Sequence, residues 1–329
     1  MHFFSESYLW RMRTLPLALL IAVLFYSCHK EKWTISEFRE QVLPVGSDLS
    51  SVWFRDSLLG YATGGQAWES GFILSTTDGG ATWRTDTLLN RKMECVMFDF
   101  TGRGYVCGQD FSMFQDPGNA RHWEIFHLSY QWARSCYFPD SHHGLIVNGE
   151  SYRNGQLEVL GPAAFWHIDT VISLPNELSS VWYTDSLTAV ATGLGWVVRS
   201  SDGGRSWTRL KVTGDFFNCV RFPTRETGFI CGYSGTILKT TDGGLTWKTI
   251  RSGGSIGTDN QPFRAIWFES PENGWIAGDN GVFWHTADGG TSWQPVAGIP
   301  GKIDFTGIFM RNGQGWATAK GGHMYLFRE

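Results

Sequence analysis

A ten-residue stretch that returns almost unchanged places the strongest constraint on how this chain can fold. Leu49–Leu58 reads LSSVWFRDSL, and Leu178–Leu187, 129 residues later, reads LSSVWYTDSL. Related stretches lie between and beyond these two, and their central apolar residues are Val52, Val96, Cys136, Val181, Val220, Ile266 and Ile308. The average spacing of about 43 residues is typical of four-stranded propeller blades. The repeat therefore predicts seven similar units.

Each unit reads as four short strands separated by turns. In the fifth unit the strands are FNCVRF, TGFICG, GTILKT and TWKTI, which are rich in β-branched and aromatic residues. The 40 glycines and 17 tryptophans among the 329 residues suit tight turns and aromatic packing between sheets. No stretch keeps a helical period of apolar residues. We therefore predict an all-β fold, a seven-bladed β-propeller of four-stranded antiparallel blades.

Four units carry a sharper motif between their third and fourth strands: TTDGGATW, SSDGGRSW, TTDGGLTW and TADGGTSW. Asp-Gly-Gly provides positive φ where the chain reverses, and the carboxylate can accept backbone N–H bonds within its own turn. The Trp five residues after the Asp is expected to cover the junction with the next blade. We interpret the motif as an Asp-box turn, and its predicted structural residues are Asp78, Trp83, Asp202, Trp207, Asp242, Trp247, Asp288 and Trp293.

The last unit ends without a fourth strand. It closes on MYLFRE, whereas the segment that begins Trp33-Thr34 resembles the missing strand. We predict that Trp33–Ile35 pairs beside Met324–Phe327, so that the N-terminal strand closes the ring. Closure removes open sheet edges, which would otherwise pair with other chains. The propeller is therefore expected to be monomeric.

The first thirty residues have the pattern of an export signal. Arg11 and Arg13 precede the apolar run Leu15–Tyr26, and Ser27-Cys28 follows at once. A Cys directly after a small residue at the end of such a run resembles the bacterial lipobox, in which Cys28 would be lipidated. The expected organisation is a lipoprotein signal peptide at residues 1–27, a lipid-anchored tether at 28–32 and the propeller at 33–329.

This organisation predicts an exported bacterial lipoprotein on the periplasmic side of a membrane or on the cell surface. The apolar run has about a dozen residues, fewer than the roughly 20 that span a bilayer. No second apolar run of spanning length follows. Contact with the membrane is therefore expected through the lipid on Cys28 only. An uncleaved anchor and a plain secreted protein remain as alternatives.

Five further cysteines lie within the repeats. Cys95 and Cys107 are twelve residues apart, as are Cys219 and Cys231, and other units hold small residues such as Ser, Thr or Ala at these positions. Each pair is either a cross-strand disulfide, as an oxidising compartment allows, or two buried thiols. Cys136 is interpreted as a small core hydrophobe. The spacings match no metal or redox motif, so neither a metal site nor a cofactor is expected.

Asp-boxes also occur in sialidases and xyloglucanase-type glycosidases, so an enzyme must be considered. Glycosidases need two carboxyl groups across a cleft, and the aspartates of the motif are already accounted for by their turns. The arginine triad and Tyr/Glu pair of sialidases, phosphate loops and nucleophile elbows are not recognisable. We predict no catalytic residues, and a sialidase-like or xyloglucanase-like glycosidase or a glycan-binding propeller remains the alternative. A net charge of −4 without a basic run argues against nucleic-acid binding.

The residues that enter the first strands are predicted to form a ring near the central opening, on the face opposite the Asp-box turns. Arg and aromatic side chains gathered on one face suit a protein-binding surface. The candidate partner-binding residues of this ring are Glu94, Arg134, Asn218 and Arg264.

The stretch Phe222–Trp247 carries a family resemblance. It reads FPTRETGFICGYSGTILKTTDGGLTW, and it resembles the photosystem II stability/assembly factor-like family of Asp-box, or BNR repeat, propellers. Better-characterised members of that family are chaperones that hold a membrane-protein precursor with an arginine-rich face. The resemblance implies a non-enzymatic protein-binding or assembly propeller with a protein partner on the predicted ring. It does not identify the partner.

Overall fold

The computed structural model describes residues 33–110, 112–115, 122–126, 131–140, 142–150, 153–161, 168–212, 214–253 and 261–329. The described residues belong to one compact unit, Trp33–Glu329. The predicted signal peptide, the tether and Cys28 lie outside them. Within the described part, no helix is long and apolar enough to cross a bilayer.

The strands of the described residues group into seven sheets, which we number by the chain order of their first strands. The first sheet contains β3 (Leu49–Phe54), β4 (Gly60–Gln66), β5 (Ser70–Thr76) and β6 (Arg84–Leu89). The second contains β7 (Met93–Phe98), β8 (Gly104–Gly108), β9 (Ser112–Gln115) and β10 (Glu124–Phe126). The third contains β11 (Ala133–Tyr137), β12 (Gly144–Glu150), β13 (Arg153–Leu160) and β14 (Ile168–Leu174).

The remaining sheets follow the same plan. The fourth contains β15 (Leu178–Tyr183), β16 (Ala189–Gly193), β17 (Trp196–Ser200) and β18 (Thr208–Arg209). The fifth contains β19 (Phe217–Arg221), β20 (Gly228–Gly232), β21 (Ile237–Thr240) and β22 (Lys248–Arg251). The sixth contains β23 (Phe263–Phe268), β24 (Gly274–Gly278), β25 (Phe283–Thr286) and β26 (Gln294–Ala297), and the seventh begins with β27 (Phe305–Arg311), β28 (Gln314–Ala319) and β29 (Met324–Arg328). The described residues also include the short 3₁₀ turns η2 (Asp279–Gly281) and η3 (Lys320–Gly322).

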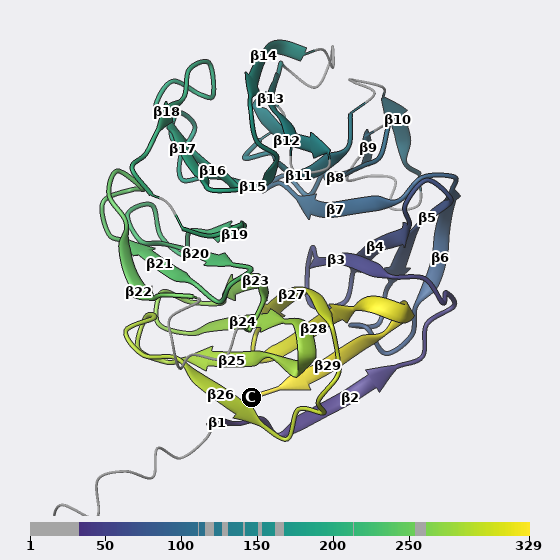
Figure 1. Cartoon of the computed structure of the whole chain (residues 1–329). Coiled ribbons are helices and arrows are strands. Elements are labelled where there is room, and N and C mark those ends of the chain that lie inside the picture. The colour runs from purple at the N-terminus through teal and green to yellow at the C-terminus, as the bar shows by residue number, and fades with distance from the viewer. Residues whose placement is uncertain are drawn as a thin grey trace, which may run out of the picture. The chain divides into compact units, whose positions relative to one another are not determined.

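The sheets stand side by side around a common centre (Figure 1). Each first strand contacts the first strand of the next sheet, and β27 of the seventh sheet contacts β3 of the first. Within each sheet, strands that follow one another along the chain pair antiparallel. The predicted all-β propeller of four-stranded antiparallel sheets is therefore confirmed.

The N-terminal segment completes the seventh sheet, but with different residues from those predicted. β2 (Glu37–Gln41) pairs antiparallel with β29, with Glu37 opposite Arg328 and Gln41 opposite Met324. The expected pairing of Trp33–Ile35 with Met324–Phe327 is wrong. β1 (Trp33–Thr34) instead runs parallel to β26, as a fifth strand of the sixth sheet.

Aromatic contacts explain this register. The Phe38 ring of β2 stacks on the Tyr325 ring at 5.0 Å between centroids and meets Phe305 edge to face. The Trp33 ring stacks on His285 of the neighbouring sheet at 4.0 Å. The Phe38 and Trp33 side chains therefore pack against different sheets, and the N-terminal segment crosses the boundary between the sixth and seventh sheets.

The antiparallel plan gives the propeller two distinct faces. We call the face with the turns between strands one and two and between strands three and four the turn face. There the Gly79 N–H donates to the Leu58 carbonyl at 2.9 Å, which joins these two turns of the first sheet. We call the opposite face, with the turns between strands two and three and the links between sheets, the link face. There the Gly65 N–H donates to the Asp48 carbonyl at 2.8 Å.

The Asp-Gly-Gly turns hold their aspartates by local hydrogen bonds. In the first sheet, Asp78 Oδ1 accepts from the Thr82 N–H at 2.9 Å and from the Thr76 hydroxyl at 2.7 Å, and Asp78 Oδ2 accepts from the Thr82 hydroxyl. The Thr82 bonds lower the pKa of Asp78 to about 2. Gly79 and Gly80 have φ of 71° and 83°, which favours glycine. Equivalent bonds hold Asp202, Asp242 and Asp288.

The tryptophans of these turns pack toward the preceding sheet rather than the next one. Trp293 of the sixth sheet meets Phe268 of its own sheet and Phe229 of the fifth sheet edge to face. Trp83 of the first sheet belongs to a core cluster that includes Trp316 of the seventh. The prediction that each tryptophan covers the junction with the next sheet is therefore wrong, because it covers the junction with the preceding sheet.

Candidate functional site

A β-bulge at the same place in every first strand positions the predicted ring. In the first sheet, Leu49 pairs with Gly64 and Ser51 with Thr63, so that Ser50 is left over between them. A bulge bends the strand and re-aims the side chain of the extra residue. The extra residues of the seven first strands are Ser50, Glu94, Arg134, Ser179, Asn218, Arg264 and Thr306.

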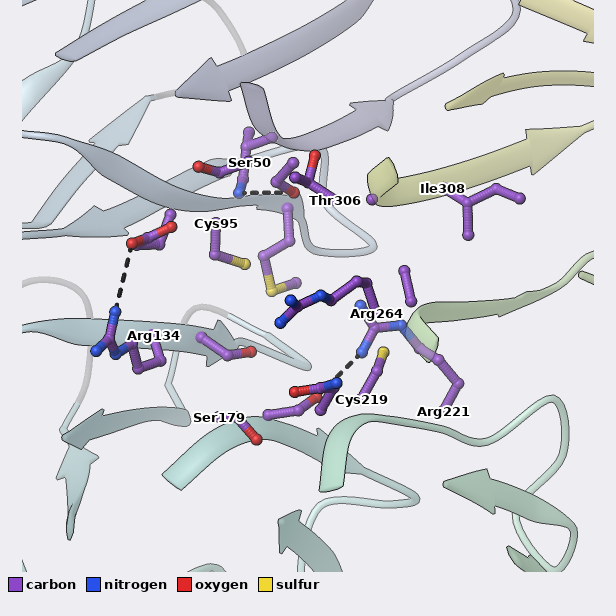
Figure 2. A pocket seen from close by; sticks show the side chains of 18 of the residues that line it. Ser50, Cys95, Arg134, Ser179, Cys219, Arg221, Arg264, Thr306 and Ile308 are labelled. Atoms are coloured by element: carbon purple, nitrogen blue, oxygen red, sulfur yellow. Dashed lines mark hydrogen bonds and ion pairs between the residues drawn. The ribbon is translucent and has the colours of Figure 1, made fainter. Parts of the chain in front are cut away.

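These seven residues line one central cavity of about 200 Å³. The cavity runs between the first strands of the described sheets, and Figure 2 shows Arg134, Ser179, Arg264 and Thr306 around it. The four residues chosen from the sequence, Glu94, Arg134, Asn218 and Arg264, are therefore brought together at one site.

Carboxylates hold the Arg134 side chain. Its Nε lies 2.7 Å from Glu177 Oε1, and its Nη1 lies 3.6 Å from Glu94 Oε1. The guanidinium also lies 3.8 Å from the centroid of the Trp132 ring, whose Nε1 donates to Glu94 at 2.9 Å. Glu94 and Arg134, taken from neighbouring sheets, thus form one paired unit rather than two independent charges.

Arg264 is paired in a similar way on the other side of the cavity. It donates two hydrogen bonds to the Asp279 carboxylate, at 2.9 Å from Nε and 2.6 Å from Nη2. Its guanidinium lies 4.9 Å from the ring centroid of Tyr233. Asn218, between the two arginines in chain order, donates to the Phe263 carbonyl. Both ring arginines are therefore neutralised locally, and the ring is polar rather than strongly positive.

An exposed aromatic cluster borders the ring on the link face. Trp68 is 48% exposed and meets Trp132 edge to face at 5.8 Å. The Arg91 guanidinium lies over the Trp68 ring and pairs with Asp110 at 2.6 Å. We call Trp68, Arg91, Trp132 and Arg134 the Arg–Trp cluster. Of these four residues, Arg134 alone belongs to the ring predicted from the sequence.

The opposite mouth of the cavity, on the turn face, was not predicted. Six of the residues three positions after the ring residues line it, and these are Trp53, Met97, Tyr137, Trp182, Arg221 and Trp267. Arg221 lies over the rings of Trp182 and Trp267, at 5.0 and 5.9 Å. These residues could have been identified from the sequence, because each lies three positions after a ring residue.

The five cysteines of the described residues are free thiols. Cys95 lies opposite Cys107, and Cys219 lies opposite Cys231, as their spacing suggested. Cys136 lies in a hydrophobic core cluster, as predicted, and its sulfur lies within 4.8 Å of those of Cys95 and Cys107. In the described part of the chain, this is the one such group close enough to hold a metal ion.

Comparisons with known proteins agree with this geometry. The model of the family described as photosynthesis system II assembly factor YCF48 matches residues 211–307. No curated protein shows significant similarity to the chain. Among solved structures, YCF48 from Cyanidioschyzon merolae is 17% identical with a TM-score of 0.68, and the alignment covers 89% of this chain and 99% of that one.

Two further structures show how far this likeness extends. The structure titled "YCF48 bound to D1 peptide" is 16% identical, with a TM-score of 0.68 and coverage of 91% of this chain and 98% of that one. The WD40 propeller domain of Doa1 reaches the same TM-score at 9% identity, with coverage of 90% and 97%. Such likenesses establish the fold.

Fold and motif together define a β-propeller built of BNR repeats. Within that class, the fifth and sixth sheets match the model of the photosynthesis system II assembly factor family, and the whole propeller is similar in fold to the solved YCF48 structures.

Proposed function

We propose that this protein is a non-enzymatic assembly or protein-binding propeller that takes a segment of a partner protein on its link face. The observation that carries the proposal is the Arg–Trp cluster beside the polar ring. Trp and Arg are the residue types that most often dominate binding energy at protein interfaces. Trp68 presents a large ring to solvent, and the structure titled as YCF48 with a D1 peptide supports a protein as the partner class.

The cavity favours binding over glycoside hydrolysis. Among the described residues that line it, Glu94 is the one carboxylate, and it is bound to Trp132 and Arg134. Glycosidases use two carboxyl groups facing each other across the substrate. Asp78 and its three equivalents are occupied within their own turns on the opposite face. A glycosidase or glycan-binding propeller is therefore the second candidate.

The proposal extends to the setting of the propeller. We infer a monomeric seven-bladed ring, with each sheet counted as one blade and the Asp-Gly-Gly turns as Asp-boxes. The lipidated Cys28 would tether it to a bacterial membrane, on the periplasmic side or at the cell surface. The signal-like residues 1–27 and the closed contacts of the first strands support this arrangement.

Replacing Trp68 and Tyr233 together by Ala is expected to weaken partner capture at least fivefold. Both rings are exposed, by 48% and 44%, and lie beside Arg91 and Arg264. Loss of an interface hot spot costs more than about 1 kcal/mol, which is about fivefold in affinity. The measurement is co-purification from native membranes, followed by titration of the identified partner. Charge reversal of Arg134 is less informative, because it would place a third carboxylate beside Glu94 and Glu177.

The matched control is Leu245→Ala, because Leu245 is 57% exposed in an Asp-Gly-Gly turn on the turn face. It is expected to leave capture unchanged. A loss of capture with Leu245→Ala and none with the double variant would assign binding to the turn face. Hydrolysis of a glycan by the purified protein would favour the second candidate.

Cys28→Ala is expected to move the protein from the membrane to the soluble fraction without lowering its melting temperature. A lipobox cysteine carries two or three acyl chains, which anchor stably where one chain is marginal. Fractionation and thermal denaturation measure the two effects. Ser27→Ala, which keeps a small residue before the cysteine, should leave the protein on the membrane. Unchanged retention of Cys28→Ala would show that the apolar segment or a partner is the anchor.

A further inference from the structure

Three cysteine sulfurs meet at the junction between the second and third sheets. Cys95 lies on β7, Cys107 on β8 and Cys136 on β11, and all three sulfur atoms lie within 4.8 Å of one another. Cys95 and Cys136 line the central cavity, and Cys107 is fully buried behind them. The group therefore combines a buried ligand with two ligands that border an accessible space.

The architecture explains why these residues meet. Cys95 and Cys107 are direct cross-strand partners within the second sheet. The Cys95 side chain points across the junction, with its sulfur 3.9 Å from the carbonyl oxygen of Cys136 in the third sheet. Cys95 of the second sheet thus faces Cys136, which occupies the central apolar position of the first strand of the third sheet.

The fifth sheet provides a natural comparison. Cys219 and Cys231 are paired in the same way, and the sulfur of Cys219 lies 3.9 Å from the carbonyl oxygen of Ile266. The two sites therefore differ at the third position, which is Cys136 in one and Ile266 in the other. Cys136 is thus the residue that converts a thiol pair into a group of three.

The pKa values of the three thiols shift in different directions. Bonds from Cys107 and from Cys136 lower the pKa of the Cys95 thiol well below its usual value. Burial raises the pKa of Cys107, and the bonds to Cys107 and Cys95 raise that of Cys136.

We propose that Cys95, Cys107 and Cys136 form a three-coordinate binding site for Cu(I). Soft thiolate ligands select Cu(I) and zinc among biological metals. Zinc is almost always four-coordinate in structural sites, whereas this group offers three ligands. Metal–sulfur bonds of about 2.3 Å in a trigonal site place the sulfurs about 4 Å apart, so sulfurs already within 4.8 Å need move little.

The binding step involves no change of oxidation state. Cu(I) forms bonds to the three sulfurs, and each thiol that is protonated before binding releases its proton to solvent. Metal binding to thiolates releases protons in this way, so affinity is expected to fall as the pH is lowered. The central cavity provides the route by which the ion reaches Cys95 and Cys136.

The test is an anaerobic titration of the full chain with Cu(I) in competition with a coloured Cu(I) chelator. The expected result is one tightly held Cu(I) per chain, with X-ray absorption showing sulfur ligands alone. Zn(II) measured in the same way should bind at least tenfold more weakly. Tighter binding of Zn(II), or no Cu(I) retained against the chelator, would overturn the proposal.

Two variants make the assignment specific. Cys136→Val introduces the residue that Val52, Val96 and Val181 provide at the equivalent position, so the fold should tolerate it. It is expected to weaken Cu(I) binding at least 100-fold, whereas Cys219→Ser in the two-thiol site should leave binding unchanged. Equal losses in both variants, or none with Cys136→Val, would contradict the proposed ligands.

A gain of binding provides an independent check. Ile266→Cys would add a third sulfur beside Cys219 and Cys231, and it is expected to raise the capacity from one Cu(I) to two. A capacity that stays at one would count against the geometric argument. Mass spectrometry of the untreated protein completes the test, since a disulfide between Cys95 and Cys107 in the native state would exclude the site.

Discussion

Removal of residues 1–46 is expected to convert a monomer into an aggregating chain with a markedly lower melting temperature. The deletion removes β2, which pairs along the whole length of β29. It also removes the Phe38 ring, which stacks on Tyr325 and contacts Phe283 and Phe305. The unpaired N–H and C=O groups of β29 would then form an open edge, which pairs readily with other chains. Thermal denaturation and light scattering measure the two effects.

A shorter deletion provides the control. A chain that begins at Trp33 loses the same signal and tether but keeps β1 and β2, so it should remain monomeric with an unchanged melting temperature. If the longer deletion behaved in the same way, the N-terminal strand would not contribute to ring closure, and the stability of the seventh sheet would have to come from its contacts with its neighbours.

Repetition made most of the fold predictable from the sequence. Because each unit repeats the same strand and turn pattern, positions such as Val52 and Val181 could be aligned without a structure. The alignment then placed Glu94, Arg134, Asn218 and Arg264 at equivalent positions, and the structure gathers them around one cavity. Their role in binding a partner remains a prediction.

The errors arose where one sheet meets another. Trp33 was matched to the outer strand by its resemblance to other units, but Phe38 is the ring that packs on Tyr325. An alignment of repeats compares equivalent positions in different units. It carries no information about which side chain packs against a neighbouring sheet. The choice between Trp33 and Phe38 depends on that fit.

Cys136 lies in a hydrophobic core cluster, as predicted, but its closeness to two other sulfurs was not anticipated for the same reason. Its position in the repeat is an apolar one, filled by Val in most units, and the spacing of the cysteines along the chain matches no metal motif. Only the packing of the second sheet against the third brings its sulfur to Cys95 and Cys107. The Glu94–Arg134 pair also crosses that junction. Together with the Arg264–Asp279 pair within the sixth sheet, this pair makes the ring less positive than its two arginines alone would.

Trp316→Ala is expected to lower the free energy of unfolding by about 3–5 kcal/mol, the usual cost of removing a large buried aromatic ring. Trp316 is 2% exposed and lies in the seventh sheet, where its ring stacks on Phe54 of the first sheet at 3.6 Å between centroids. It also lies directly against Gly80 of the first Asp-Gly-Gly turn. The substitution would therefore leave a cavity at the junction between the seventh and the first sheets.

Denaturant unfolding measures this loss, and Trp68→Ala is the matched control. Trp68 is the same residue type but is 48% exposed, so its removal should change stability by no more than about 0.5–1 kcal/mol. A difference of several kcal/mol between the two variants would show that the junction of the first and seventh sheets is a major source of stability. Equal losses would contradict this, and they would also mean that Trp68 supports the fold rather than presenting a free ring to a partner.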